Sequence, residues 1–290
     1  MINCVALVSD TANLKYAAFL IHQLSDKIDS KIPVFVFTIG VTKESFGKVF
    51  DALKCKQILI SLRSLEQLKV KSSRHVSTAT YLKLFIPGSL PAYFEKCLYI
   101  DCDTYLNDNL DEVFKIDFNT QIAAVEKLQP STHIFKDGQS KYFNAGVLLF
   151  NLKLISKTQF MNKARTILME YPDLPFQDQD VLNILYKDSW SELPESYNYF
   201  PWNFMNSTKY KSEDIKIIHF IGPIKPWSLE SPYSGWWLKW RLEFEKFTPN
   251  SLLVTKRNRP EYQFLRKIGK VKAAQFITRL LPNSLINSIV

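Results

Sequence analysis

The chain has 290 residues and a net charge of +9, from 37 basic and 28 acidic side chains. Hydrophobic residues make up 46% and charged residues 22%, which is typical of a globular protein and argues against intrinsic disorder. Residues 236–290 hold eleven basic and three acidic side chains, so this tail carries +8 and the remaining 235 residues carry +1. A nearly neutral body argues against a nucleic-acid partner, which needs a basic surface on the folded domain.

Other protein classes are also disfavoured. No run approaches the ~18 apolar residues that cross a bilayer, and the N-terminus lacks the basic flank of a signal peptide. The four cysteines form no CxxC pair and do not cluster with histidines, so we expect reduced structural thiols and no zinc site. Reduced thiols indicate a cytoplasmic location.

In chain order, short apolar runs alternate with helical patterns over the first 220 residues, which predicts an α/β domain. The expected strands are 3–8, 34–39, 57–62, 97–100, 121–125, 142–150 and 217–221. The expected helices are 16–24, 43–53, 78–85, 160–171 and 178–187. Neither a GxGxxG nor a GxxxxGK[ST] motif is present, so a dinucleotide-binding domain or a P-loop enzyme is not expected. Beyond this domain, assigned to residues 1–245, the pattern of residues 246–290 predicts a basic amphipathic helical tail.

The strongest motif is an apolar strand that leads directly into Asp101 and Asp103. Residues i and i+2 share one face at a strand end, so both carboxylates can point to the same place. Paired carboxylates suit a divalent cation that carries phosphates, although the same residues could only cap a turn. The chemistry fits a sugar-nucleotide transferase, or less well an aspartate-nucleophile phosphatase of the haloacid dehalogenase type.

Three further segments could contribute polar groups. His219 ends an apolar run and is followed by Gly222 and Lys225, which together could bind a diphosphate. Residues 176–183 place carboxylates and amides at a helix start, and residues 142–150 carry Asn144 on an apolar strand. Each segment also has a purely structural interpretation, as a buried histidine, a helix cap or a strand end.

Taken together, these segments resemble glycosyltransferase family 8, the retaining GT-A enzymes that include bacterial lipopolysaccharide galactosyl- and glucosyltransferases and the glycogenins. The matching segments are, in family order, 75–84, 98–103, 143–149, 177–183 and 219–227. The resemblance spans residues 1–245 and implies a GT-A fold, a Rossmann-like mixed sheet flanked by helices.

The resemblance also implies roles for individual residues. Mn²⁺, or alternatively Mg²⁺, would bind Asp101, Asp103 and His219 and bridge the diphosphate of a UDP-sugar. Gly222 and Lys225 would contact the phosphates, and Asp10 and Asn13 would contact the uridine. The sugar and its reacting carbon would be contacted by Asn144, Asp178 and Gln179. The donor site would also include Lys83, Cys102 and Ala145. The loop 127–141 would fold over the donor.

The chain departs from the family pattern at two positions. The tyrosine that stacks on uracil in the family has no direct counterpart, so either a displaced Tyr16 or an apolar residue takes its place. Lys83 stands where the bacterial enzymes commonly have arginine, which keeps the charge and loses the bidentate geometry.

The expected protein is therefore a retaining, Mn²⁺-dependent hexosyltransferase that moves galactose or glucose from a UDP-sugar to a cell-surface glycan such as lipopolysaccharide or capsule. A self-glucosylating, glycogenin-like enzyme is the alternative. Since Gln179 is a weak nucleophile, we favour same-face attack by the acceptor, with double displacement through Asp178 as the competing mechanism. The basic tail predicts peripheral binding to anionic membrane on the cytoplasmic side, or otherwise a solvated helical cap.

Overall fold

The computed structural model describes residues 2–50, 60–64, 78–127, 141–155, 157–201, 211–228, 231–232 and 234–248. Contacts divide the chain into two units. The first contains Met1–Tyr199 and Thr208–His219, and the second contains Phe200–Ser207 and Phe220–Val290.

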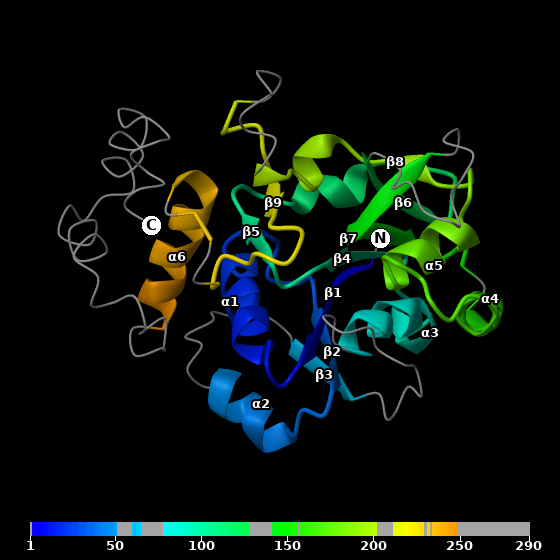
Figure 1. Cartoon of the computed structure of the whole chain (residues 1–290), viewed down its shortest axis with the longest axis horizontal. Coiled ribbons are helices and arrows are strands. Elements are labelled where there is room, and N and C mark those ends of the chain that lie inside the picture. The colour runs from blue at the N-terminus through cyan, green and yellow to red at the C-terminus, as the bar shows by residue number, and fades with distance from the viewer. Residues whose placement is uncertain are drawn as a thin grey trace. The chain divides into compact units, whose positions relative to one another are not determined.

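The first unit is built on a seven-stranded mixed sheet with the strand order β3-β2-β1-β4-β7-β6-β8 (Figure 1). Its strands are β1 (Asn3–Asp10), β2 (Val34–Ile39), β3 (Ile60–Ser64), β4 (Lys96–Ile100), β6 (Ile122–Lys127), β7 (Tyr142–Asn151) and β8 (Ser191–Glu192). Strands β1 to β4 are mutually parallel, and β7 runs antiparallel to both β4 and β6. The chain order reverses between β1 and β4, which is the switch point where open α/β sheets bind ligands.

Alternating residues of β1 supply two separate apolar clusters, one on each face of the sheet. Cys4, Ala6 and Val8 belong to one cluster, whereas Val5 and Leu7 belong to the other. Period-two alternation with both faces buried is what a central parallel strand requires.

Different helices cover the two faces. Helix α1 (Leu14–Leu24) packs into the cluster of Val5 and Leu7. The other face is covered by η1 (Thr78–Phe85), α3 (Ile86–Ser89), α4 (Lys157–Glu170) and α5 (Asp178–Leu185). The remaining helices of this unit are α2 (Lys43–Phe50), η2 (Asp111–Lys115) and η3 (Glu195–Tyr197).

The α/β prediction is confirmed, and the expected strands are present with shifted ends. The last expected strand, 217–221, is shorter than predicted: β9 (Ile217–His219) pairs with the three-residue strand β5 (Thr104–Leu106) and forms a bridge with Tyr199 on its other side. The helix expected at residues 78–85 is present with the same bounds and is a 3₁₀ helix, and Pro87 follows in the first turn of α3. The predicted segments 57–62 and 43–53 lie partly outside the described residues.

The second unit contains the helix α6 (Gly235–Phe247). Its aromatic side chains pack within the unit. Phe220 contacts Trp237 with ring centroids 4.6 Å apart, and Trp240 stacks on Phe244 at 4.7 Å. These tryptophans are therefore core residues, and the predicted membrane-binding tail lies almost entirely in residues 249–290, outside the described part of the chain.

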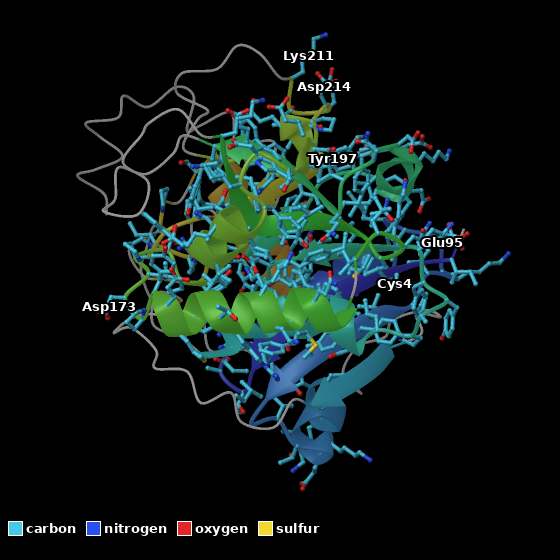
Figure 2. The ribbon with its side chains drawn as sticks, turned by 90° about the vertical axis from the view of Figure 1, so that its right-hand side faces the viewer. Cys4, Glu95, Asp173, Tyr197, Lys211 and Asp214 are labelled. Carbon is cyan, nitrogen blue, oxygen red and sulfur yellow. The ribbon has the colours of Figure 1, made fainter. Side chains whose placement is uncertain are left out.

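Cys4, Cys97 and Cys102 are free thiols, and Figure 2 shows Cys4 among the packed side chains. Cys4 and Cys97 are buried register partners on β1 and β4, in agreement with the prediction of structural thiols. Among the residues that the structure describes, no helix is both long and apolar enough to span a membrane.

Candidate active site

Neighbouring strands bring the predicted uridine and metal residues to one edge of the sheet. Asp10 ends β1, and Asp101 directly follows β4, its parallel neighbour. The Cys102 thiol donates a hydrogen bond to the Val8 carbonyl oxygen at 3.1 Å. Cys102 thus joins the loop after β4 to the end of β1 at the switch point.

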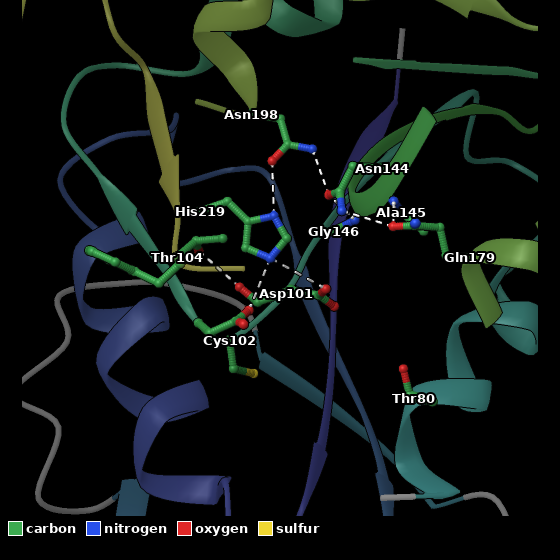
Figure 3. Close-up of polar contacts among 12 residues, drawn as sticks. Thr80, Asp101, Cys102, Thr104, Asn144, Ala145, Gly146, Gln179, Asn198 and His219 are labelled. Atoms are coloured by element: carbon green, nitrogen blue, oxygen red, sulfur yellow. Dashed lines mark hydrogen bonds and ion pairs between the residues drawn. The ribbon is translucent and has the colours of Figure 1, made fainter. Parts of the chain in front are cut away.

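Asp101, Asp103 and His219 form a cluster that could hold a metal ion (Figure 3). The pairing of Thr104 in β5 with His219 in β9 brings the imidazole to the two aspartates. His219 Nε2 lies 3.3 Å from Asp103 Oδ1 and 3.8 Å from Asp101 Oδ2. When ligand atoms lie about 2.1 Å from an octahedral ion, two adjacent ligand atoms are about 3.0 Å apart and two opposite ones are about 4.2 Å apart. The spacing and the hard oxygen and imidazole donors therefore fit Mn²⁺ or Mg²⁺.

The position of His219 is fixed by close packing. Its side chain is buried, and its Nδ1 atom lies 2.9 Å from Asn198 Oδ1. On another side it rests on Gly146, where an added Cβ would lie 2.0 Å from the ring carbon Cε1. A glycine is required here because no other residue leaves room for the imidazole.

The two carboxylate oxygens of Asp101 have different neighbours. Oδ1 contacts Lys83 Nζ at 3.2 Å and accepts a hydrogen bond from the Tyr99 hydroxyl, whereas Oδ2 faces His219. Burial raises the pKa of Asp101 above its usual value; Lys83 opposes this shift and Asp103 adds to it. A divalent cation would relieve the repulsion between the two carboxylates.

Lys83 connects the metal residues to Asp178. Its buried ammonium contacts Asp178 Oδ2 at 2.8 Å and donates to the Ala145 carbonyl at 3.1 Å, in addition to Asp101. Burial lowers the pKa of Lys83, but the attraction of Asp101 and Asp178 outweighs burial and raises that pKa above its ordinary value. All three N–H donors face protein acceptors, so Lys83 holds the site together, and its contact with the donor sugar stays a prediction.

Asp178 is also held on both oxygens. Thr80 donates to Oδ1 at 2.6 Å, and Lys83 occupies Oδ2. Residues i and i+3 share a face of a 3₁₀ helix, so the conformation of η1 directs Thr80 and Lys83 to the same carboxylate. Asp178 itself begins α5, where the helix dipole favours a negative charge.

Gln179 and Asn144 form the next part of the site. Gln179 Oε1 accepts hydrogen bonds from Asn144 Nδ2 at 2.8 Å and from the Ala145 backbone N–H at 3.1 Å. Gln179 Nε2 donates to the Tyr142 hydroxyl at 2.9 Å. The structure therefore brings together Asn144, Asp178 and Gln179, the predicted sugar-contacting residues, and Ala145 of the predicted donor site, although no sugar contact is tested.

At the predicted uridine site, Asp10 Oδ1 accepts hydrogen bonds from the Asn13 backbone at 2.8 Å and from its side chain at 2.9 Å. This turn opens α1 and keeps both residues at the sheet edge. Tyr16 is buried in α1, and burial raises the pKa of its hydroxyl. The expected residue that stacks on uracil is either a displaced Tyr16 or an apolar residue. Because Tyr16 is buried, we favour the apolar residue.

Gly222 and Lys225 belong to the second unit. Gly222 has a φ of +87°, which only glycine adopts readily. Lys225 Nζ donates to the Phe220 carbonyl at 3.1 Å, and its backbone N–H donates to Ser228. Arg241, buried in α6, supports the same loop through the carbonyl oxygens of Pro226, Ser228 and Ser231.

Several polar groups of the site were not assigned roles from the sequence. Asn198, Tyr142, Thr80 and Tyr99 contact the predicted site residues, as Figure 3 shows for Asn198. Tyr142 and Thr80 stand beside or inside the family motifs and could have been found there. The predicted donor-covering loop, 127–141, lies outside the described residues except at its two ends.

Comparison with known proteins identifies the family. The sequence model of "Glycosyl transferase family 8" matches residues 4–230. The chain belongs to glycosyl transferase family 8. Membership in this family argues against the alternative interpretation of Asp101 and Asp103 as part of an aspartate-nucleophile phosphatase.

Similar curated proteins come from several bacteria. The chain is 27% identical over 201 residues to "Lipopolysaccharide 1,2-glucosyltransferase" of Escherichia coli K12, covering 63% of this chain and 60% of that protein. It is 27% identical over 175 residues to "General stress protein A" of Bacillus subtilis, covering 54% and 61%. The chain thus matches somewhat under two thirds of the length of these relatives.

Solved structures show the same fold. A structure of the galactosyltransferase LgtC, in complex with donor and acceptor sugar analogues, matches with a TM-score of 0.71 and 23% identity, covering 88% of this chain and 99% of that one. The glycosyltransferase GlyE of Streptococcus pneumoniae matches with a TM-score of 0.60 and 22% identity, covering 84% and 63%. The predicted GT-A architecture of this family 8 protein is confirmed.

Proposed function

We propose that the protein is a retaining, metal-dependent hexosyltransferase that transfers galactose or glucose from a UDP-sugar to a lipopolysaccharide-type cell-surface glycan. The observation that carries the proposal is the cluster of Asp101, Asp103 and His219 at the switch point of a family 8 fold. Relatives named as lipopolysaccharide glucosyltransferases support the class of acceptor.

The residues of the chain have separable tasks in this proposal. Asp101, Asp103 and His219 would hold the cation, which when bound neutralises the negative charge that develops on the departing diphosphate. Lys225 and Gly222 would contact the phosphates, and Asp10 and Asn13 would orient the uridine. Asn144, Asp178 and Gln179 would face the sugar and its reacting carbon.

The contacts of Asp178 favour same-face attack over double displacement. A covalent intermediate on Asp178 needs a carboxylate oxygen that is exposed to the anomeric carbon. Both oxygens are occupied, one by Thr80 and one by Lys83, and the residue is buried. A neutralised, hydrogen-bonded carboxylate is a poor nucleophile, so we infer that the acceptor hydroxyl attacks directly and the departing phosphate takes its proton.

The proposal is tested by measuring UDP release from UDP-galactose, UDP-glucose and UDP-N-acetylglucosamine, with and without Mn²⁺. Asp101→Asn and Asp103→Asn should each lower turnover by about 10²-fold or more, because each removes a charged ligand. The exposed Asp117→Asn is the matched control and should behave as the wild type. Release of UDP from no donor, or full activity of both ligand variants, would refute the proposal.

We further propose that the basic tail, residues 246–290, binds anionic membrane and keeps the enzyme peripheral on the cytoplasmic face. The test replaces Arg266, Lys267, Lys270 and Lys272 by glutamine in the full chain and measures binding to vesicles with and without anionic lipid. At about 1 kcal/mol for each basic residue near an anionic surface, binding should fall by 10²-fold or more. The control removes the same charge from the exposed Lys31, Lys43, Lys48 and Lys115 and should bind normally. Equal binding by all three proteins would exclude the tail as a membrane anchor.

A further inference from the structure

A continuous series of side-chain hydrogen bonds leads from the metal cluster to the sugar-facing amides. Asn198 lies at its centre and is fully buried. Asn198 Oδ1 lies 2.9 Å from His219 Nδ1, and Asn198 Nδ2 donates to Asn144 Oδ1 at 2.9 Å. Asn144 then donates to Gln179, as described above. The Asn198 side chain thus links the imidazole of His219 to the amide of Asn144.

The direction of these bonds is set by two backbone groups. The Gly146 N–H donates to Asn144 Oδ1 at 2.9 Å, and the Ala145 N–H donates to Gln179 Oε1 at 3.1 Å. A backbone nitrogen can only donate, so both contacted side-chain atoms must be oxygens. The orientations of the Asn144 and Gln179 amides are therefore determined by the protein backbone.

The same reasoning fixes Asn198 and then His219. Because Asn144 presents its oxygen, Asn198 must present its NH₂ group to Asn144 and its own oxygen to the imidazole. That oxygen can only accept, so His219 carries its hydrogen on Nδ1. In the neutral imidazole the lone pair is then on Nε2, the atom that faces Asp101 and Asp103. A neutral ring with a lone pair directed at the cluster is the form that binds a metal ion.

The far end of the series is anchored on a buried carboxylate. Gln179 Nε2 donates to the Tyr142 oxygen, and the Tyr142 hydroxyl donates to Asp180 Oδ1 at 2.7 Å. The buried Asp180 also accepts from the Phe176 backbone at 2.8 Å. Every bond from His219 to Asp180 therefore has a defined donor and acceptor, and reversing one amide would place two donors or two acceptors face to face.

We propose that Asn198 is a positioning residue for the metal site: it holds His219 in the Nδ1–H tautomer and couples the ligand's orientation to the Asn144–Gln179 pair. This inference rests on the metal-binding role proposed above. In water a neutral histidine favours hydrogen on Nε2, which would point a proton at the cation. Asn198 removes that competing state before metal binds, because a hydrogen-bond partner on the far nitrogen fixes the tautomer and orientation of a metal-binding histidine.

The experiment uses the full chain without sugar donor. Mn²⁺ affinity is measured from the electron paramagnetic resonance signal of the free ion for Asn198→Ala, Asn198→Asp and the control Asn107→Ala. Asn107 follows β5 and donates to the carbonyl oxygens of Ser212 and Ile215, which precede β9, whereas His219 ends that strand. We expect a 10- to 100-fold loss of affinity in Asn198→Ala. Asn107→Ala should bind Mn²⁺ as the wild type does.

Asn198→Asp separates the two tasks of the residue. Its carboxylate still accepts from His219 Nδ1, so Mn²⁺ affinity should be kept. It cannot donate to Asn144, so turnover of the UDP-sugar should fall while metal affinity does not. Unchanged affinity in Asn198→Ala, or an equal loss of affinity in both variants, would overturn the proposal.

A direct readout of the tautomer protects the test against variants that do not fold. Nitrogen-15 correlation spectra of the wild-type, metal-free protein should show the His219 hydrogen on Nδ1, with the signal assigned by its loss in His219→Gln. Hydrogen on Nε2 would overturn the inference even if the metal role holds. Conversely, a wild type with the Nδ1–H tautomer that binds no divalent cation would refute the proposed metal site and not the role of Asn198 in orienting the ring.

Discussion

Gly146 offers a test of the metal site that changes no polar group. It lies in β7, next to β4, and His219 packs directly on its Cα. Its φ is outside the left-handed region, so the backbone itself accepts alanine. Gly146→Ala therefore perturbs one thing, the space that the imidazole occupies.

The size of the perturbation follows from the distances. The new Cβ would stand 2.0 Å from Cε1, 2.6 Å from Nδ1 and 2.8 Å from Nε2, whereas ordinary contact begins at 3.4 Å. The ring must therefore withdraw by about 1.4 Å, while metal–ligand distances tolerate only about 0.2 Å. Displacements of about 1 Å in an active site cost on the order of 10²-fold in rate, so turnover should fall by at least that factor. Overpacking of the core should cost a further 1–3 kcal/mol or so of folding free energy.

The assay compares Mn²⁺ titrations of UDP-sugar turnover and thermal unfolding for Gly146→Ala, Gly88→Ala and the wild type. Gly88, in α3, is a matched control because its Cβ would stand 2.3 Å from Met161 Sδ, at the flexible end of a side chain far from the cluster in sequence. Gly146→Ala should lose both stability and Mn²⁺ affinity, whereas Gly88→Ala should lose little stability, because the end of Met161 can move, and should keep its Mn²⁺ affinity. If Gly146→Ala binds Mn²⁺ and turns over donor normally, the packing argument for His219 is wrong.

Four other outcomes are expected. Tyr142→Phe removes the hydroxyl between Gln179 and Asp180, so it should cost about 1–3 kcal/mol of stability and slow turnover. Its Mn²⁺ affinity should not change, and a loss of affinity would contradict the assignment of Tyr142 to the sugar-facing part of the site. Lys83→Met leaves two carboxylates without their counter-charge and should destabilise the protein by about 3–5 kcal/mol in denaturant unfolding. Adding Asp178→Asn should restore part of the lost stability. If it restores none, the loss does not come from the pairing of Lys83 with Asp178. Arg241→Ala should weaken UDP binding, measured by calorimetry, because the loop that bears Lys225 loses three contacts, and Arg241→Lys should be intermediate. Mn²⁺ at 100 times its dissociation constant should stabilise the wild type by about 2.7 kcal/mol in thermal unfolding, and it should hardly stabilise Asp103→Asn. Equal stabilisation of the two proteins would mean that the ion binds outside the cluster of Asp101, Asp103 and His219.

Much of the fold could be predicted from local pattern. Apolar runs such as the one that forms β1 are visible in the sequence because both faces of a central strand are buried. Asp101 and Asp103 could be recognised because their spacing alone places them on one face. The three-residue strand β5 could not, because Thr104–Leu106 is too short to show a period, and its partner β9 is more than a hundred residues away in the chain.

The parts of the site that depend on long-range contact were not predictable in the same way. Asn198 lies in an irregular stretch between two tyrosines, and nothing around it indicates that its partners are Asn144 and His219. The use of Lys83 as a bridge between two carboxylates likewise depends on how η1 packs against α5. Gly146 did carry a signal, because a glycine within an apolar strand indicates close approach by another group. The sequence alone could not show that this group is the imidazole of the proposed metal site.

The arrangement of the three ligands along the chain has a topological consequence. Asp103 and His219 stand at the two ends of a long segment that includes Asn144, Asp178, Gln179 and Asn198. An ion bound to both ends closes that segment into a ring, as a disulfide would, except that the closure is reversible. The strands β5 and β9 already align those ends by three residue pairs, and Asn107 and Asp108 add contacts to the residues before β9. A bound cation would add a further cross-link to this junction. Binding of the ion would then hold the junction of β5 and β9 more firmly, and its release would remove only this reversible cross-link.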